Sequence, residues 1–165
     1  MKIVIAPLGG LIGAILGGVL WAKYIQWTGN TAGLIAIGIG LFSGIGMLLT
    51  CSGAIEPNEK KQWLMVAIGA AIFSVIGIFI GKYLDVQWNA LTQMTEQLIA
   101  SEPSLTEEAA TSMAKTVYSG SSRWEHMKDR MDWFDLLFGS IAVIVAFYIT
   151  LNPRVRNIIS KLSRI

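Results

Sequence analysis

The chain has 165 residues, of which 53% are hydrophobic and only 15% are charged, and its formal net charge is +2. Soluble domains carry about 25% charged residues, whereas here the apolar residues form long runs, which is typical of a membrane protein. The small net charge argues against a nucleic-acid partner. The single cysteine, Cys51, excludes an intrachain disulfide. We therefore expect an all-α membrane protein.

The first apolar run, residues 3–24, predicts a membrane helix. It is longer than the core of a normal signal peptide, so we do not expect it to be cleaved. Gly9, Gly13 and Gly17 recur at every fourth residue and form a ridge on one face of this helix. Such ridges bring membrane helices into close contact. The contact is made either with another helix of the same chain or between the subunits of a homo-oligomer.

The second apolar run, residues 33–51, contains no charge and no proline. At about 1.5 Å per residue it is long enough to cross a hydrocarbon layer of about 30 Å. Its glycines, among them Gly33, Gly40 and Gly44, would be costly in a soluble helix but permit close helix packing in a membrane. We expect this helix to be the packing centre of the protein.

A third helix is expected to begin near Trp63, with an apolar run that reaches Ile80. Beyond Lys82 the apolar residues continue at helical spacing as far as Leu98, with polar residues between them. We therefore expect the helix to leave the bilayer as an amphipathic extension. Pro103 should end it, because the residue before a proline disfavours helical geometry.

A new helix is predicted to start at the capping box formed by Ser104 and Glu107. A fourth apolar run, residues 134–151, should enter the membrane as the continuation of a helix that begins outside it. The predicted architecture is therefore a four-helix transmembrane protein with a helical extracytoplasmic hairpin that extends helices 3 and 4. Its parts are residues 1–84 (three membrane helices), 85–132 (the hairpin), 133–151 (the fourth membrane helix) and 152–165 (a cytoplasmic basic amphipathic helix).

The C-terminal segment begins with Asn152 and Pro153, which are typical of a helix N-cap and of the first helical position. An amphipathic helix is predicted to follow, with bases that no acid opposes. Such a helix suits the anionic headgroups of the cytoplasmic leaflet, and the alternative is a disordered basic tail. The four bases are Arg154, Arg156, Lys161 and Arg164.

Four spans would place both termini on the same side of the membrane, together with most of the Lys and Arg of the short segments. Such segments stay in the cytoplasm, so we predict a multi-pass protein of the cell membrane, in a bacterium the inner membrane, with both termini cytoplasmic. Trp21, Tyr24 and Trp27 cluster where the first helix should leave the bilayer, as an aromatic belt would.

Side chains suited to catalysis are scarce. No ionisable residue lies deep within a predicted span, which argues against an ion-driven transporter. His126 is the only histidine, and with one cysteine the chain offers neither a zinc cluster nor a catalytic triad. We expect no enzymatic activity, no metal and no cofactor.

Two acids stand at the predicted outer mouth of the fourth helix. Asp132 and Asp135 are one helical turn apart. They form either an interfacial pair offset by Lys23 or Lys82, or an acidic ring at the entrance of an oligomeric pore, which would favour cations.

Part of the chain resembles a known motif. Trp21-Ala22, Thr28-Gly29, Gly33 and the segment 36–40 (Ala-Ile-Gly-Ile-Gly) resemble a pattern found in an uncharacterised family of small bacterial multi-pass membrane proteins. Residues 77–84 are similar to the third helix of that family. The chain departs from the pattern after Gly29, where the family has an aromatic residue and an acid. The resemblance covers residues 9–84 and implies a bacterial source and a compact membrane module, often an appendage to other domains, but no activity.

The leading hypothesis is a non-enzymatic membrane protein that forms a glycine-packed homo-oligomer and serves as an anchor, scaffold or sensor for a protein partner. The alternative is an oligomeric pore or channel with an acidic outer mouth, for example a stress or defence effector. A small-molecule transporter or membrane enzyme is disfavoured because the predicted spans lack polar ligands.

Overall fold

The computed structural model describes residues 2–28, 34–51, 54–56, 59–117, 128 and 133–162. The described residues form helices and contain no strand, so the all-α prediction is confirmed for this part of the chain. The helices are α1 (Lys2–Thr28), α2 (Leu34–Cys51), α3 (Lys60–Ser101), α4 (Glu107–Val117), α6 (Trp133–Leu151) and α7 (Pro153–Leu162).

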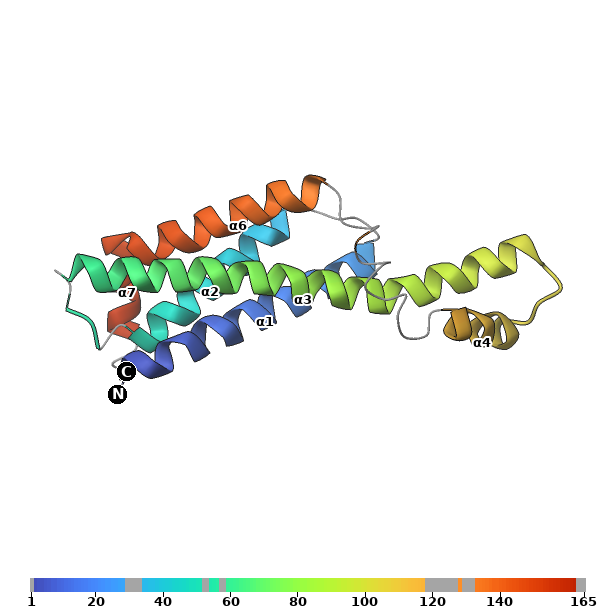
Figure 1. Ribbon diagram of the computed structural model, residues 1–165, viewed down its shortest axis with the longest axis horizontal. Coiled ribbons are helices and arrows are strands. Elements are labelled where there is room, and N and C mark those ends of the chain that lie inside the picture. Colours follow the sequence, from blue (N-terminus) through green and yellow to red (C-terminus); the bar gives the residue numbers. More distant parts are fainter. Residues whose placement is uncertain are drawn as a thin grey trace.

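Four helices run side by side and form what we call the bundle: α1, α2, α6 and residues 60–84 of α3 (Figure 1). The helices α2 and α3 are central, because each contacts both α1 and α6. Among the described residues, α1 and α6 do not contact each other. The start of α1 and the end of α7 lie at the same end of the bundle, which we call the α7 end (Figure 1).

The helix α3 continues well beyond the bundle. It has 42 residues, which corresponds to about 63 Å at 1.5 Å per residue. The helical spacing of apolar residues after Lys82 correctly indicated this extension. After Ser101 the chain turns, with the N–H of Glu102 donating to the carbonyl of Leu98 at 2.9 Å, and α4 folds back along α3 (Figure 1). We call residues 85–101 of α3 together with α4 the arm.

The cap of α4 differs from the predicted one. The hydroxyl of Thr106, not that of Ser104, accepts the N–H of a residue in the first turn, namely Ala109 at 3.3 Å. Ser104 instead lies within a turn in which the N–H of Leu105 donates to the carbonyl of Glu102 at 3.0 Å. The proline-induced turn thus occupies the position at which the pattern placed the cap, and the helix begins at Glu107.

The predicted cap of the last helix is confirmed. The side-chain oxygen of Asn152 accepts the N–H of Arg154 at 2.9 Å, and Pro153 is the first residue of α7. The axis of α7 is bent 71° from that of α6. The basic segment is therefore helical as far as Leu162, rather than a disordered tail.

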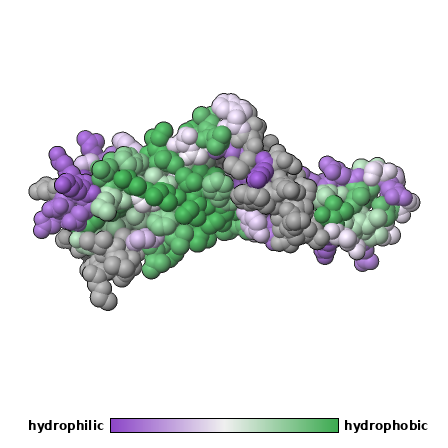
Figure 2. Space-filling model, viewed as in Figure 1, coloured by the Kyte–Doolittle hydropathy of each residue, from purple (hydrophilic) through white to green (hydrophobic). Residues whose placement is uncertain are grey.

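Among the described residues, two helices are long and apolar enough to cross a membrane on their own, α1 from Pro7 to Thr28 and α3. The number rises to three if α6 and α7 form one bent span, whereas the apolar part of α2, Ala36–Cys51, is shorter. Figure 2 shows the corresponding surface, a broad hydrophobic band over the bundle between more hydrophilic ends. The chain is therefore a membrane protein by the length and composition of its helices.

Candidate functional site

A buried ion pair joins α3 to α6 at the arm end of the bundle. The Nζ atom of Lys82 lies 2.9 Å from the Oδ2 atom of Asp135, and the two side chains are only 8% and 9% exposed. Asp135 stands in the first turn of α6, where the helix dipole favours a negative charge. Because each charge would be costly to bury alone, the pair fixes α3 and α6 in one register.

A second buried acid, Asp85, follows Lys82 by three residues on α3. Asp85, one turn beyond Lys82 on α3, is 4% exposed, and its carboxylate accepts the amide of Asn89 at 2.5 Å. Residues three apart share a helix face. The arm end of the bundle therefore buries ionisable side chains at the level where the helices separate.

An apolar groove begins at the ion pair and runs along the seam between α3 and α6. Its volume is about 400 Å³, within the range of small-molecule sites of roughly 300–1,000 Å³. Lys82 and Asp135 are its charged lining residues, and the remainder of the lining is almost entirely apolar. The other residues that line it are Val75, Ile78, Phe79, Leu136, Gly139, Ser140, Val143 and Ile144.

Aromatic side chains mark the level of the ion pair. Tyr83 follows Lys82 and is 41% exposed, and Trp133, at the start of α6, is 59% exposed. Trp27 is 81% exposed, as an aromatic belt requires. The belt prediction is wrong for Trp21, which is 3% exposed. Its ring packs against α3 because Gly81 leaves room for it: a Cβ there would lie 2.6 Å from the Trp21 ring.

The predicted glycine ridge of α1 faces α2 within the same chain. A Cβ added at Gly9 would overlap the carbonyl oxygen of Gly46, and one added at Gly46 would overlap that of Gly9. Likewise, a Cβ at Gly13 would overlap the carbonyl of Phe42, and one at Gly17 would lie 2.9 Å from the Cα of Ile39. These glycines therefore allow α1 and α2 to touch backbone to backbone.

The glycines of α2 on its other side face α6. A Cβ at Gly40 would overlap the carbonyl of Ala142, and one at Gly44 would lie 3.3 Å from the carbonyl of Ala146. Gly38 differs from both, because a Cβ there would meet nothing within 4 Å. Gly33 lies outside the described residues. Since these contacts occur within one chain, the homo-oligomer stays a prediction that would need other faces of the bundle.

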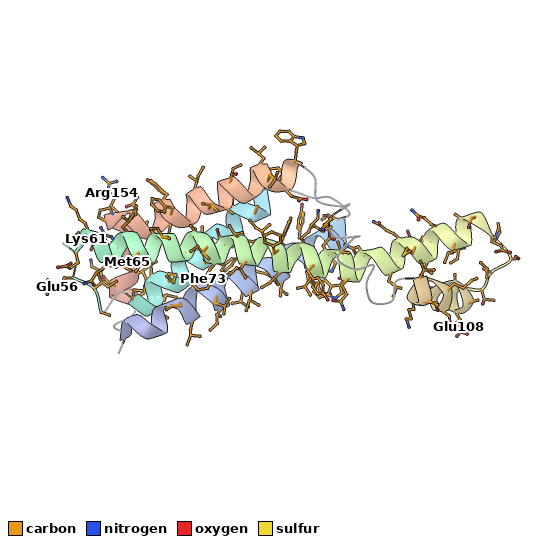
Figure 3. The ribbon with its side chains drawn as sticks, viewed as in Figure 1. Glu56, Lys61, Met65, Phe73, Glu108 and Arg154 are labelled. Atoms are coloured by element: carbon orange, nitrogen blue, oxygen red, sulfur yellow. The ribbon has the colours of Figure 1, made fainter. Side chains whose placement is uncertain are left out.

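The α7 end carries the predicted basic residues in two different environments. The guanidinium of Arg156 lies over the ring of Trp63, 4.4 Å from its centroid, and burial lowers the pKa of Arg156 from its ordinary value. Arg154 and Lys161 are exposed, and their contact with lipid headgroups stays a prediction. Figure 3 shows Arg154 and Lys61 at this same end. Arg164 lies outside the described residues.

Of the two predicted pore-mouth acids, the structure describes Asp135. Asp132 lies outside the described residues, as does His126. Asp135 pairs with Lys82, one of the two partners that the first interpretation considered. The other, Lys23, instead lies 4.6 Å from the ring centroid of Trp88. Because a paired acid presents less net negative charge, the pairing gives the acidic ring no support, and the pore stays a prediction.

Sequence reasoning missed the burial of Lys82 and Asp85, which it placed at the membrane surface and in the amphipathic extension. A signal was present in Gly77 and Gly81, two turns and one turn before Asp85, because small residues let a neighbouring helix approach α3 closely. A Cβ at Gly77 would lie 2.7 Å from the carbonyl of Ala14 on α1. Within the described ranges, no three His, Cys, Asp or Glu side chains gather as a metal site.

Comparisons of the chain with protein-family models, with curated proteins and with solved structures find no match. The resemblance of residues 9–84 to the bacterial membrane family therefore stays a prediction.

Proposed function

We propose that this protein is a non-enzymatic, four-pass membrane scaffold that presents the arm outside the bilayer as a recognition surface for a protein partner. The observation that carries the proposal is the length of α3. Its 42 residues extend for about 63 Å, roughly twice the 30 Å of a bilayer's hydrocarbon. A helix that crosses the membrane within the bundle must therefore project far from it.

The composition of the arm supports its placement in water. The helix α4 begins with Glu107 and Glu108 and carries Lys115 in its last turn, and such charges are rare within a bilayer. Ala110 and Ala114 are fully buried, whereas Met113 and Val117 are 50% and 61% exposed. An amphipathic surface with exposed apolar side chains suits a protein partner.

The proposed four spans add α2 and α6 to the two helices that meet the length criterion alone. The helix α2 has 18 residues and α6 has 19, which corresponds to about 27 and 28 Å. Both carry long apolar sequences, and four spans account for the start of α1 and the end of α7 lying at one end of the bundle (Figure 1). The bases at that end favour a cytoplasmic placement.

Labelling of single cysteines tests the placement. In a Cys51→Ala background, Glu108→Cys should react with a membrane-impermeant maleimide added to intact cells, and Lys161→Cys should react only after permeabilisation. Ile144→Cys, which lies on the apolar surface of α6 and is 64% exposed, is the matched control and should react in neither case. Labelling of Lys161→Cys in intact cells would contradict the proposed orientation and place the α7 end outside the cell.

Photocrosslinking tests the recognition surface. A photoreactive residue at Val117 should give a discrete adduct in intact cells, and the same residue at Leu16, which is 52% exposed on α1, should not give that adduct. An adduct at twice the 18.0 kDa mass of the chain would identify a second copy as the partner. No adduct from Val117 together with correct labelling of Glu108→Cys would reject recognition while keeping the topology.

A further inference from the structure

The groove between α3 and α6 has the form of a site for an amphipathic molecule. It is apolar along most of its length. Its two charged lining residues, Lys82 and Asp135, lie together at one end. On α3 these lining residues extend from Val75 to Lys82, a rise of about 10 Å. A groove of this length is shorter than one half of the 30 Å hydrocarbon layer, so it matches the depth of one leaflet.

The position of the charges fits the headgroup region. The aromatic residues Tyr83 and Trp133, one residue from Lys82 and two from Asp135 in the sequence, are exposed, and such residues lie at the headgroup boundary. A molecule with its polar part at the ion pair would therefore have its chain in the groove. A phospholipid in the leaflet on the arm side of the membrane has this same orientation, with its headgroup toward the arm and its acyl chains toward the middle of the bilayer.

The charges also favour one kind of headgroup. The ammonium of Lys82 has three N–H donors, and its described ion-pair partner is Asp135, so it can also donate to a phosphate oxygen. Asp135 attracts a headgroup ammonium and repels a headgroup that is only anionic. A zwitterionic phosphoethanolamine head is complementary to both charges.

We propose that the groove between α3 and α6 is a binding site for one zwitterionic phospholipid, with an acyl chain along Ile78, Phe79 and Val143 and its phosphate at Lys82. The confinement of the groove to one leaflet favours a lipid over a helix of a second copy, because a membrane helix would contact the bundle across both leaflets. The site goes beyond the proposed scaffold function and does not depend on a partner for the arm.

Filling the groove tests the acyl-chain position. Ser140 lines it and is exposed, and its hydroxyl donates to the carbonyl of Leu136 in its own helix at 2.8 Å. Ser140→Leu should therefore fill the groove without disturbing the bundle. Gly38→Leu adds similar bulk at a position where a Cβ meets nothing within 4 Å, and it is the matched control.

Native mass spectrometry of the full chain in detergent, titrated with phosphatidylethanolamine, provides the measurement. The wild type should bind one lipid per chain. Ser140→Leu should weaken that binding about ten-fold or more, because each methylene group displaced from an apolar site weakens affinity several-fold. Gly38→Leu should bind as the wild type does, and equal binding by Ser140→Leu and Gly38→Leu would overturn the proposal.

A second arm of the experiment tests the headgroup. Phosphatidylglycerol, which lacks the ammonium, should bind the wild type more weakly than phosphatidylethanolamine does. The neutral pair Lys82→Gln with Asp135→Asn should remove this preference while the thermal midpoint shows that the chain is folded. A wild type without any preference would overturn the headgroup assignment. If the wild type is instead a dimer without bound lipid, and Ser140→Leu converts it to a monomer, the lipid proposal is overturned. The groove would then be the contact with a second copy of the chain.

Discussion

The bundle and the arm are both helical, yet their helices pack in different ways. In the bundle, α1 and α2 touch at Gly9 and Gly46 with their backbones in contact, while large apolar side chains such as Leu16 point outward. In the arm, α4 buries the small side chains of Ala110 and Ala114 and exposes charged residues. Lipid removes the hydrophobic driving force between helices, so close backbone approach must replace it in the bundle.

The comparison also predicts how each region responds to damage. The bundle depends on a few positions at which no added atom fits. The arm buries little apolar surface, and an α4 of 11 residues is too short to be a stable helix by itself. Substitutions in the bundle should therefore change the stability of the whole protein, whereas substitutions in the arm should change the stability of the arm alone.

The largest effect is expected from breaking the buried ion pair. Lys82→Met should lower the free energy of unfolding by about 3–5 kcal/mol, because it leaves the buried Asp135 without its cation. The double variant Lys82→Met with Asp135→Leu should recover most of that loss. Unfolding in detergent, followed by tryptophan fluorescence, measures both. Lys115→Met in the arm is the control, with an expected change within about 0.5 kcal/mol. If the loss in the double variant equalled the sum of the losses in Lys82→Met and Asp135→Leu alone, the pairing would be contradicted.

An intermediate effect is expected from adding one methyl group to the bundle. Gly46→Ala should lower the free energy of unfolding by about 1–3 kcal/mol, because its Cβ would overlap the backbone of Gly9. Gly38→Ala, in the same helix but facing open space, should be neutral or stabilise by up to about 1 kcal/mol. The same unfolding assay compares them, and equal stabilities of the two variants would refute backbone contact as the basis of packing.

The smallest effect is expected in the arm. Thr106→Ala removes the hydroxyl that caps α4, which should destabilise that helix by about 1 kcal/mol. Hydrogen exchange should accelerate for the amides of α4 and remain unchanged for those of α2. Ser112→Ala, at an exposed position within α4, is the control and should leave the exchange of α4 as it is. Acceleration throughout the bundle would show that the two regions unfold together.

Much of the fold could be predicted from local patterns. Apolar spacing beyond Lys82 predicted the long α3, and Asn152 with Pro153 predicted the start of α7, because both signals are carried by neighbouring residues. The cap of α4 was misplaced from Thr106 to Ser104, since both hydroxyl side chains make good caps and the turn that decides between them depends on Pro103.

The candidate site could not be predicted in the same way. The groove and the ion pair depend on which helix faces which, and Lys82 and Asp135 are far apart in sequence. The glycine pattern indicated close packing but not its partners, so the contact of Gly40 with Ala142 required the structure. Trp21 was assigned to the membrane boundary because of its type, whereas its burial follows from the space that Gly81 leaves on another helix.

The continuity of α3 couples the bundle to the arm. Because one unbroken helix of 42 residues belongs to both regions, a tilt imposed at its first turn is transmitted to its last. Over a length of about 63 Å, each degree of tilt displaces the far end by roughly 1 Å. A rearrangement at Trp63, where Arg156 of α7 lies over the same helix, would thus be magnified into a movement of the arm on the opposite side of the bundle.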